Sequence, residues 1–96
     1  MVEEPAPERV RMPRGKEMFG IAEATLGANK IRVRCRDSVY RICRIPGRFK
    51  KRIWIKADDV ILMEPWDIQG DKFGDVVWKY RPAQAEHLRR KGLLNF

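Results

Sequence analysis

A dense run of basic residues gives this sequence its clearest chemical signal. Residues 30–56 contain eleven lysines and arginines against one acid, Asp37, so these 27 residues carry a charge of +10. The whole chain carries +8, and the other 69 residues therefore sum to −2 (8 − 10). A charge this concentrated attracts polyanions, and nucleic acid is the partner that fits it best. An acidic protein or an anionic membrane would fit it less well.

The sequence offers no set of residues for catalysis or metal binding. His87 is the single histidine, and no serine or cysteine has a base placed near it in the pattern. Cys35 and Cys43 have neither the number nor the spacing of a zinc site. The glycines lack the spacing of a phosphate-binding loop. We therefore expect a binding protein with no catalytic residues, no metal and no cofactor.

Length and composition predict one small soluble domain. The chain has 96 residues, of which 35% are charged and 44% hydrophobic. Its longest apolar run, residues 60–63, is far shorter than the ~20 residues of a membrane span. Residues 1–15 contain three glutamates and three prolines, unlike a signal peptide. We expect a cytoplasmic monomer that does not bind a membrane.

Turn signals divide the chain into short strands. We expect strands at 18–26, 30–36, 39–45, 53–56 and 60–64, a further strand at 75–80 and a helix at 83–91. Gly20 predicts a bulge or bend in the first strand. Pro82 suits the first position of the helix, and Gly92 suits its end.

Five short strands, of which the second and third are basic, predict a mainly β fold: a five-stranded barrel of the OB type with an extra C-terminal strand and a short helix. Such barrels bind oligonucleotides across the second and third strands. A β-sandwich or an SH3-like barrel also fits the periodicity. We expect a flexible N-terminal tail at 1–15, the barrel at 16–65, and at 66–96 a C-terminal extension packed on or beside it.

The second strand alternates strictly between apolar and basic side chains: Ile31, Val33 and Cys35 on one face, Arg32, Arg34 and Arg36 on the other. A two-residue turn at Asp37-Ser38 would place Arg41 opposite Arg34 on the outer face and turn Ile42 toward the core. Such a like-charge pair is destabilising unless a phosphate lies over it.

The same register has two further consequences. It places Arg44 on the core side, which predicts a bulge near residues 43–45. It also places Cys35 and Cys43 on opposite faces, so we expect two reduced, half-buried thiols. Outside the basic run, we expect the aromatic residues Trp66, Trp78 and Tyr80 in the core or under the terminal helix.

Three runs carry a family resemblance: RMPRGKEMFGIAEATLG (11–27), VRCRDSVYRICR (33–44) and RIPGRFKKRIWI (44–55). Together they resemble archaeal translation initiation factor 1A, the relative of eukaryotic factor 1A and of bacterial initiation factor 1. The resemblance covers nearly the whole chain from Arg11, and it includes the turn at Asp58-Asp59.

The resemblance implies an S1-like OB barrel that binds the decoding (A-site) region of the small ribosomal subunit and contacts its RNA. It also implies support for initiator tRNA binding and start-codon selection, together with other initiation factors. The matching positions for RNA contact are Arg44, Arg48, Lys50, Lys51 and Arg52. The long acidic C-terminal tail of the eukaryotic factor has no counterpart in this sequence, so contacts through it are not implied.

The full set of expected RNA-binding residues joins the sheet arginines, which rest on the alternation alone, to the positions carried over from the family. It comprises Arg32, Arg34, Arg36, Arg41, Arg44, Arg48, Lys50, Lys51, Arg52, Trp54 and Lys56. Phe49 and Trp54 either stack on bases or pack in the barrel. Two other functions remain open: a general single-strand RNA-binding or chaperone module, and an adaptor for an acidic protein.

Overall fold

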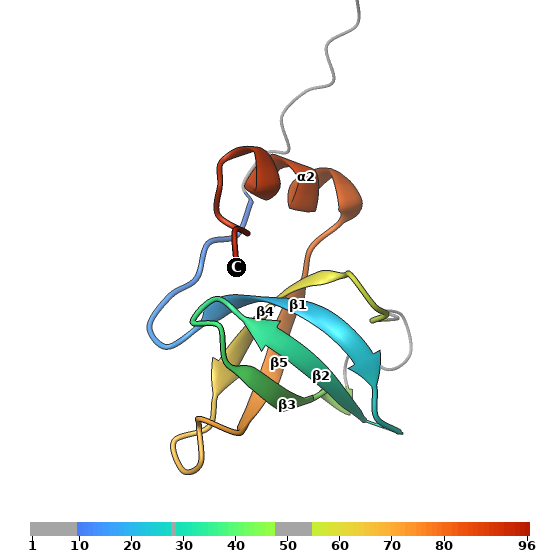
Figure 1. Cartoon of the computed structure of the whole chain (residues 1–96), viewed down its shortest axis with the longest axis vertical. Coiled ribbons are helices and arrows are strands. Elements are labelled where there is room, and N and C mark those ends of the chain that lie inside the picture. Colours follow the sequence, from blue (N-terminus) through green and yellow to red (C-terminus); the bar gives the residue numbers. More distant parts are fainter. Residues whose placement is uncertain (1–9, 28, 48–54) are drawn as a thin grey trace, which may run out of the picture.

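The structure is a computed structural model, and it describes residues 10–27, 29–47 and 55–96. Within these residues, five strands close into a barrel in the order β1-β2-β3-β5-β4, and one helix lies to one side of it (Figure 1). The elements are β1 (Met18–Thr25), β2 (Lys30–Cys35), β3 (Tyr40–Arg44), β4 (Val60–Pro65), β5 (Phe73–Lys79) and α2 (Pro82–Arg90). The predicted mainly β, OB-type barrel with a short terminal helix is confirmed.

The strand that closes the barrel, β5, lies within residues 66–96, which we expected to form an extension. β5 pairs in parallel with β3, with Ile42 opposite Phe73, and antiparallel with β4. The boundary expected at residue 65 therefore falls inside the barrel. The strand expected at 53–56 lies partly outside the described residues, and Ile55 and Lys56 are not in a strand.

Two clusters of buried side chains hold the molecule together. One fills the barrel and comprises Ala22, Ile31, Val33, Cys35, Cys43, Ile55, Ile61, Met63 and Val76. The other joins the barrel to α2 and comprises Phe19, Val60, Leu62, Tyr80, Ala85, Leu88 and Leu94. Tyr80 thus lies under the helix as expected. Pro82 begins the helix, and Gly92 follows its end with a φ of +74°.

Close packing between strands explains why residue 20 is a glycine. A Cβ atom at this position would lie 2.4 Å from Cγ1 of Val33, so the strand requires glycine there. The expected bulge at Gly20 is wrong, because Gly20 keeps regular pairing with Cys35 and Ile61. The irregularity of β1 lies between Ala22 and Ala24 instead.

The β2–β3 hairpin has a different register from the one we expected. Val33 lies opposite Arg41, and Arg34 lies opposite Tyr40. The backbone N–H of Cys35 donates to the carbonyl of Val39 at 3.0 Å, which leaves three residues, 36–38, in the turn. Ser38 takes a φ of +67°, as in three-residue hairpin loops that end in a left-handed residue. The turn is therefore one residue longer than expected.

This one-residue difference changes the face on which each β3 side chain lies. Ile42 points outward and is 37% exposed, whereas Arg41 is only 7% exposed. Arg44 is exposed, so no bulge near residues 43–45 is required. Cys35 and Cys43 are free thiols as expected, but both are fully buried in the barrel cluster rather than on opposite faces.

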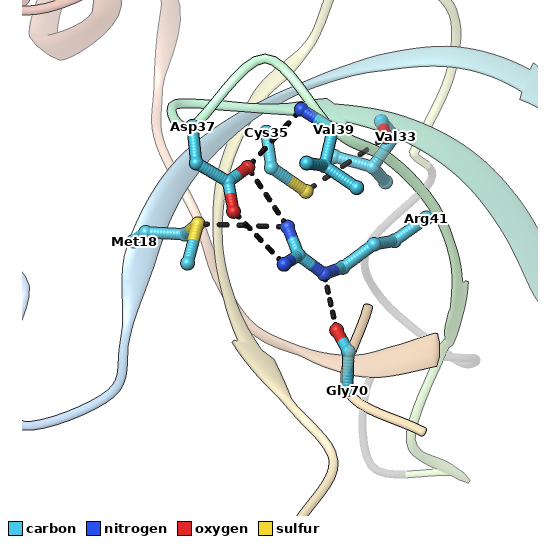
Figure 2. Close-up of polar contacts among 7 residues, drawn as sticks. All are labelled: Met18, Val33, Cys35, Asp37, Val39, Arg41 and Gly70. Atoms are coloured by element: carbon cyan, nitrogen blue, oxygen red, sulfur yellow. Dashed lines mark hydrogen bonds and ion pairs between the residues drawn. The ribbon is translucent and has the colours of Figure 1, made fainter. Parts of the chain in front are cut away.

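Arg41 is held by acceptors from two loops, as Figure 2 shows. Its Nη1 and Nη2 each donate to a carboxylate oxygen of Asp37 at 2.9 Å, and its Nε donates to the carbonyl of Gly70. Hydrogen bonding to Arg41 lowers the pKa of Asp37. Burial raises the pKa of Cys35, whose thiol lies beside this cluster. Arg41 thus ties the β2–β3 turn to the β4–β5 loop.

The chain before β1 packs against the barrel and helix from residue 10. Val10 packs on the second cluster, and the Tyr80 hydroxyl donates to the carbonyl of Arg11. The Arg11 guanidinium lies 5.6 Å from the Trp78 ring centroid and 3.0 Å from Glu17. Burial raises the pKa of Tyr80 to about 12. The expectation of a free tail up to residue 15 is therefore wrong for residues 10–15, and residues 1–9 lie outside the described residues.

Replacing Asp37 with asparagine tests the Arg41 cluster. At neutral pH we expect a loss of about 1–3 kcal/mol in the free energy of unfolding, because a buried guanidinium loses its charged acceptor. The Asp37 side chain is 40% exposed, which keeps the loss below the about 3–5 kcal/mol of a fully buried pair. Urea unfolding measures it, with Asp71→Asn in the exposed β4–β5 loop as the control.

The pH dependence provides a second readout of the same variant. Asp37 has a lower pKa in the folded chain than in the unfolded chain. Its contribution is therefore present above about pH 4 and is lost as the pH falls through the folded pKa. The wild-type protein should lose more stability on acidification than Asp37→Asn, so the two curves should converge. Parallel curves would contradict the pairing.

Candidate nucleic-acid interface

The outer face of β2 and β3 brings together part of the expected RNA-binding set. Arg32 and Arg44 are exposed and Arg34 is half-buried on this face. Arg36 leaves it, since its Nη1 donates to the carbonyl of Leu93 at 2.9 Å in the C-terminal segment. The alternation of β2 thus correctly predicted a cationic face. Arg36, which lies in the turn after β2, contacts the C-terminal segment instead.

Arg41 does not belong to this face. Its side chain is buried and hydrogen-bonded to Asp37, and this pair raises the pKa of the guanidinium. The predicted opposition of Arg34 and Arg41 is wrong. Arg34 faces Tyr40 across the hairpin instead, so no like-charge pair destabilises the sheet at this point.

One acid lies between the two central arginines. Glu23 lies at the irregularity of β1, with a carboxylate oxygen 3.8 Å from Nε of Arg32 and another 3.5 Å from Nη1 of Arg34. Its side chain is 31% exposed. A single carboxylate shared by two cations leaves this part of the face with a net positive charge. The sequence alone could have pointed to Glu23 as the acid near these arginines, because Glu23 is the only acid in the predicted first strand.

Exposed aromatic rings accompany the arginines. The Arg32 guanidinium lies 4.8 Å from the ring centroid of Tyr40, which is 47% exposed. The Arg44 guanidinium lies 5.4 Å from Trp66, which is 37% exposed and packs on Phe73. The expectation that Trp66 lies in the core or under the helix is therefore wrong. Sequence reasoning missed both rings as parts of this face.

Arg44 has an internal partner as well. Its Nε and Nη2 donate to the two carboxylate oxygens of Asp75 at 3.1 and 3.3 Å, and Nε1 of Trp66 donates to the same carboxylate at 3.1 Å. Arg44 lies on β3, Asp75 lies on the adjacent strand β5, and Trp66 directly follows β4. A phosphate reaching Arg44 would compete with Asp75.

The remaining expected positions are not tested by the described residues. Arg48, Phe49, Lys50, Lys51, Arg52 and Trp54 lie outside them. Lys56 is described and exposed beyond this gap, and its backbone N–H donates to the Asp59 carboxylate at 2.9 Å.

Residues 10–27, 29–47 and 55–96 present no grouping of metal ligands. No three His, Cys, Asp or Glu side chains in this part of the chain come close enough to hold a metal ion. None of its helices is long and apolar enough to cross a membrane.

The arrangement on β2 and β3 suits a single-stranded polyanion. Cations on a sheet attract phosphates, while exposed rings offer stacking surfaces that tolerate any base.

The family model described as translation initiation factor 1A / IF-1 matches residues 7–96. The chain belongs to this family. The resemblance stated from the sequence is thereby confirmed.

Relatives with similar sequences align with most of the chain. Translation initiation factor 1A of Methanococcus maripaludis strain S2 is 47% identical over 92 residues, which cover 94% of this chain and 88% of the relative. The factor 1A of Pyrococcus abyssi is 45% identical over 84 residues, covering 88% of this chain and 74% of the relative. These relatives are named as initiation factors and not as enzymes.

A solved structure shares the fold. The solution structure of translation initiation factor 1 from the Wolbachia endosymbiont of Brugia malayi superimposes with a TM-score of 0.53 at 25% identity. The match covers 69% of this chain and 78% of that one. It supports the assignment of the barrel to the OB type.

Replacing Glu23 with glutamine tests whether the central arginines bind phosphate. We expect the affinity for a single-stranded RNA hexamer to rise by up to about fivefold at low salt, as for the removal of an exposed ion pair of roughly 0.2–1 kcal/mol. The gain should shrink as salt screens the charges. Fluorescence anisotropy measures it.

The matched control for this variant is Glu86→Gln, which removes the acid that pairs with Arg89 and Arg90 on α2. It changes the net charge by the same amount away from β2 and β3. Equal effects of the two variants would show that only net charge matters and that Arg32 and Arg34 do not contact phosphate.

Proposed function

We propose that this protein, as a member of the initiation factor 1A family, binds the decoding (A-site) region of the small ribosomal subunit. There it supports initiator tRNA binding and start-codon selection together with other initiation factors. The outer face of β2 and β3 carries this proposal, because Arg32 and Arg34 share one acid there beside the exposed ring of Tyr40.

The charge distribution explains how this face would contact ribosomal RNA. RNA phosphates would take the place of the Glu23 carboxylate and release bound counterions, which makes binding depend steeply on salt. The basic positions at 48 and 50–52 follow β3 directly in the sequence and extend the same positive segment. Contacts of this kind position the protein on RNA, whereas specificity for the decoding region comes from the shape of that RNA.

A general single-strand RNA-binding module is the second candidate. The exposed aromatic rings favour it, since stacking on Tyr40 or Trp66 would not distinguish one base sequence from another. The two candidates differ in what they predict for subunits. An initiation factor prefers the small subunit over other RNA, and a general module does not.

Co-sedimentation separates the two candidates. We expect the wild-type protein to sediment with purified small ribosomal subunits, to remain in the supernatant with large subunits, and to resist competition by an excess of unstructured RNA. Equal sedimentation with both subunits, or complete displacement by the competitor, would contradict the proposal and favour the general module.

Paired substitutions locate the contact surface in the same assay. We expect Arg32→Gln/Arg34→Gln to weaken small-subunit binding by at least about tenfold, since two charged hydrogen bonds are lost. The control Arg89→Gln/Arg90→Gln removes the same charge from the exposed face of α2 and should change binding little. Lys51→Glu/Arg52→Glu tests the positions carried over from the family.

A further inference from the structure

Trp78 is turned out of the barrel by an irregularity in β5. Val76 lies opposite Met63 of β4, whereas the neighbouring β4 residue, Leu62, lies opposite Trp78, so Val77 is an extra residue in β5. Val76 is buried in the barrel cluster, and in a regular strand the residue two positions later would point the same way. The extra residue changes this direction, as β-bulges do. Trp78 is therefore 40% exposed and belongs to neither buried cluster, and the expectation that it lies in the core or under the helix is wrong.

Arg11 lies over the exposed ring of Trp78. Its guanidinium is 5.6 Å from the ring centroid, and its Nη2 donates to a carboxylate oxygen of Glu17 at 3.0 Å. Among the described residues, Nε of Arg11 is buried without an acceptor, and the indole N–H of Trp78 has no acceptor either. A buried donor without an acceptor costs free energy. A bound partner with carbonyl or carboxylate oxygens would supply acceptors at this place.

The segment that carries Arg11 is fixed before a partner arrives. Val10 packs on the cluster between the barrel and the helix, and the Tyr80 hydroxyl donates to the carbonyl of Arg11. The Glu17 carboxylate accepts from the backbone N–H of Arg14 at 3.2 Å, and the backbone N–H of Glu17 donates to the carbonyl of Arg14 at 3.0 Å. Binding therefore does not have to order this segment, which favours affinity.

Met12 adds an exposed apolar side chain to the same segment. It follows Arg11 directly in the chain and is 47% exposed. Aromatic residues, methionine and arginine are enriched in protein–protein interfaces, and tryptophan and arginine are enriched among the hot-spot residues. We call Arg11, Met12, Arg14 and Trp78 together the Trp78 surface.

The charge of the Trp78 surface favours an acidic partner. Residues 10–16 contain three cations and no acid. Two of these cations have acid partners, since Arg11 pairs with Glu17 and Lys16 pairs with Asp67. Among the described residues, the exposed side chain of Arg14 has no acid partner. An exposed cation without a counter-ion attracts a carboxylate on a partner and steers its approach.

We propose that the Trp78 surface binds an acidic segment of another protein. An apolar side chain of that segment packs on Trp78 and Met12, and one of its carboxylates lies at Arg14. A protein segment fits better than RNA, because Arg11 covers a ring face on which a base would stack and its charge is already neutralised by Glu17. This protein interface is separate from the RNA interface on β2 and β3, and the proposal does not depend on the proposed function.

Peptide selection tests this surface without a choice of partner. A phage-displayed library of random dodecapeptides is selected on the full-length protein, with a uridine hexanucleotide in excess to occupy the outer face of β2 and β3. We expect enriched peptides that combine acidic and apolar residues. Enrichment of no peptide, or of basic peptides, would overturn the proposal.

Trp78→Gln then locates the binding site of an enriched peptide. Fluorescence anisotropy of the labelled peptide should show an affinity about 30-fold lower than that of the wild type, as for a hot-spot residue. The control Ile68→Gln changes an apolar side chain that is 80% exposed in the β4–β5 loop, and it should keep the wild-type affinity. Equal affinities of Trp78→Gln and the wild type would show that the peptide binds elsewhere, which the proposal excludes.

Arg14→Glu tests the charge of the partner without disturbing the packing around Trp78. We expect the peptide affinity to fall at least about fivefold at low salt and less at high salt, because an exposed ion pair is lost. The control Arg89→Glu makes the same change of net charge on α2 and should alter the affinity little. Equal losses in the two variants would mean that only net charge matters, and the proposal would be wrong.

RNA binding separates this proposal from the proposed function. Urea unfolding first establishes that each variant is folded under the assay conditions. Trp78→Gln should then bind the uridine hexanucleotide and small ribosomal subunits as the wild type does. If it loses RNA affinity as well as peptide affinity, the surface belongs to the RNA interface and the proposal is wrong. If the wild type fails to sediment with small subunits while the peptide results hold, the proposed function fails and the protein interface stands.

Discussion

The hydrogen-bonded ion pair between Arg41 and Asp37 fixes which side chains of the β2–β3 hairpin face outward. A buried guanidinium needs charged and neutral acceptors, and the turn carboxylate and the Gly70 carbonyl supply them. In the neighbouring register Arg41 would face solvent and Ile42 the core. A slip of one residue exchanges the two faces of a strand, so this pair selects between two arrangements of the same sequence.

The composition of the candidate interface depends on this β2–β3 register. With Arg41 inside, Tyr40 and Ile42 face outward beside Arg32, and β3 presents an apolar and aromatic surface rather than another arginine. The same guanidinium fixes the β4–β5 loop, which begins at Trp66 and leads into Phe73, the first residue of β5. The rings of Trp66 and Phe73 pack on each other. One buried cation therefore positions the aromatic rings, while the exposed arginines supply the charge that would attract RNA.

The sequence predicted the approximate positions of the five barrel strands, the helix and the cationic face of β2, because alternation and turn residues report directly on local structure. It also predicted a strand at 53–56, to which the described residues Ile55 and Lys56 do not belong. It did not predict the hairpin register, since nothing in Asp37-Ser38 shows that Ser38 takes a left-handed conformation in a longer turn. Arg41 looked like a surface residue because the acceptors that allow its burial come from the turn and from a distant loop. Glu23 was not predicted beside the arginines because the irregularity of β1 shifts the pairing with β2.

The dependence of RNA affinity on salt tests most directly whether Arg32 and Arg34 bind phosphate. For the wild-type protein and Arg32→Gln/Arg34→Gln, the logarithm of the association constant is measured against the logarithm of salt concentration. Two lost phosphate contacts should reduce the magnitude of the slope by about 1.4 to 1.8. A weaker affinity with an unchanged slope, or no change in either, would contradict phosphate binding by this face of the barrel.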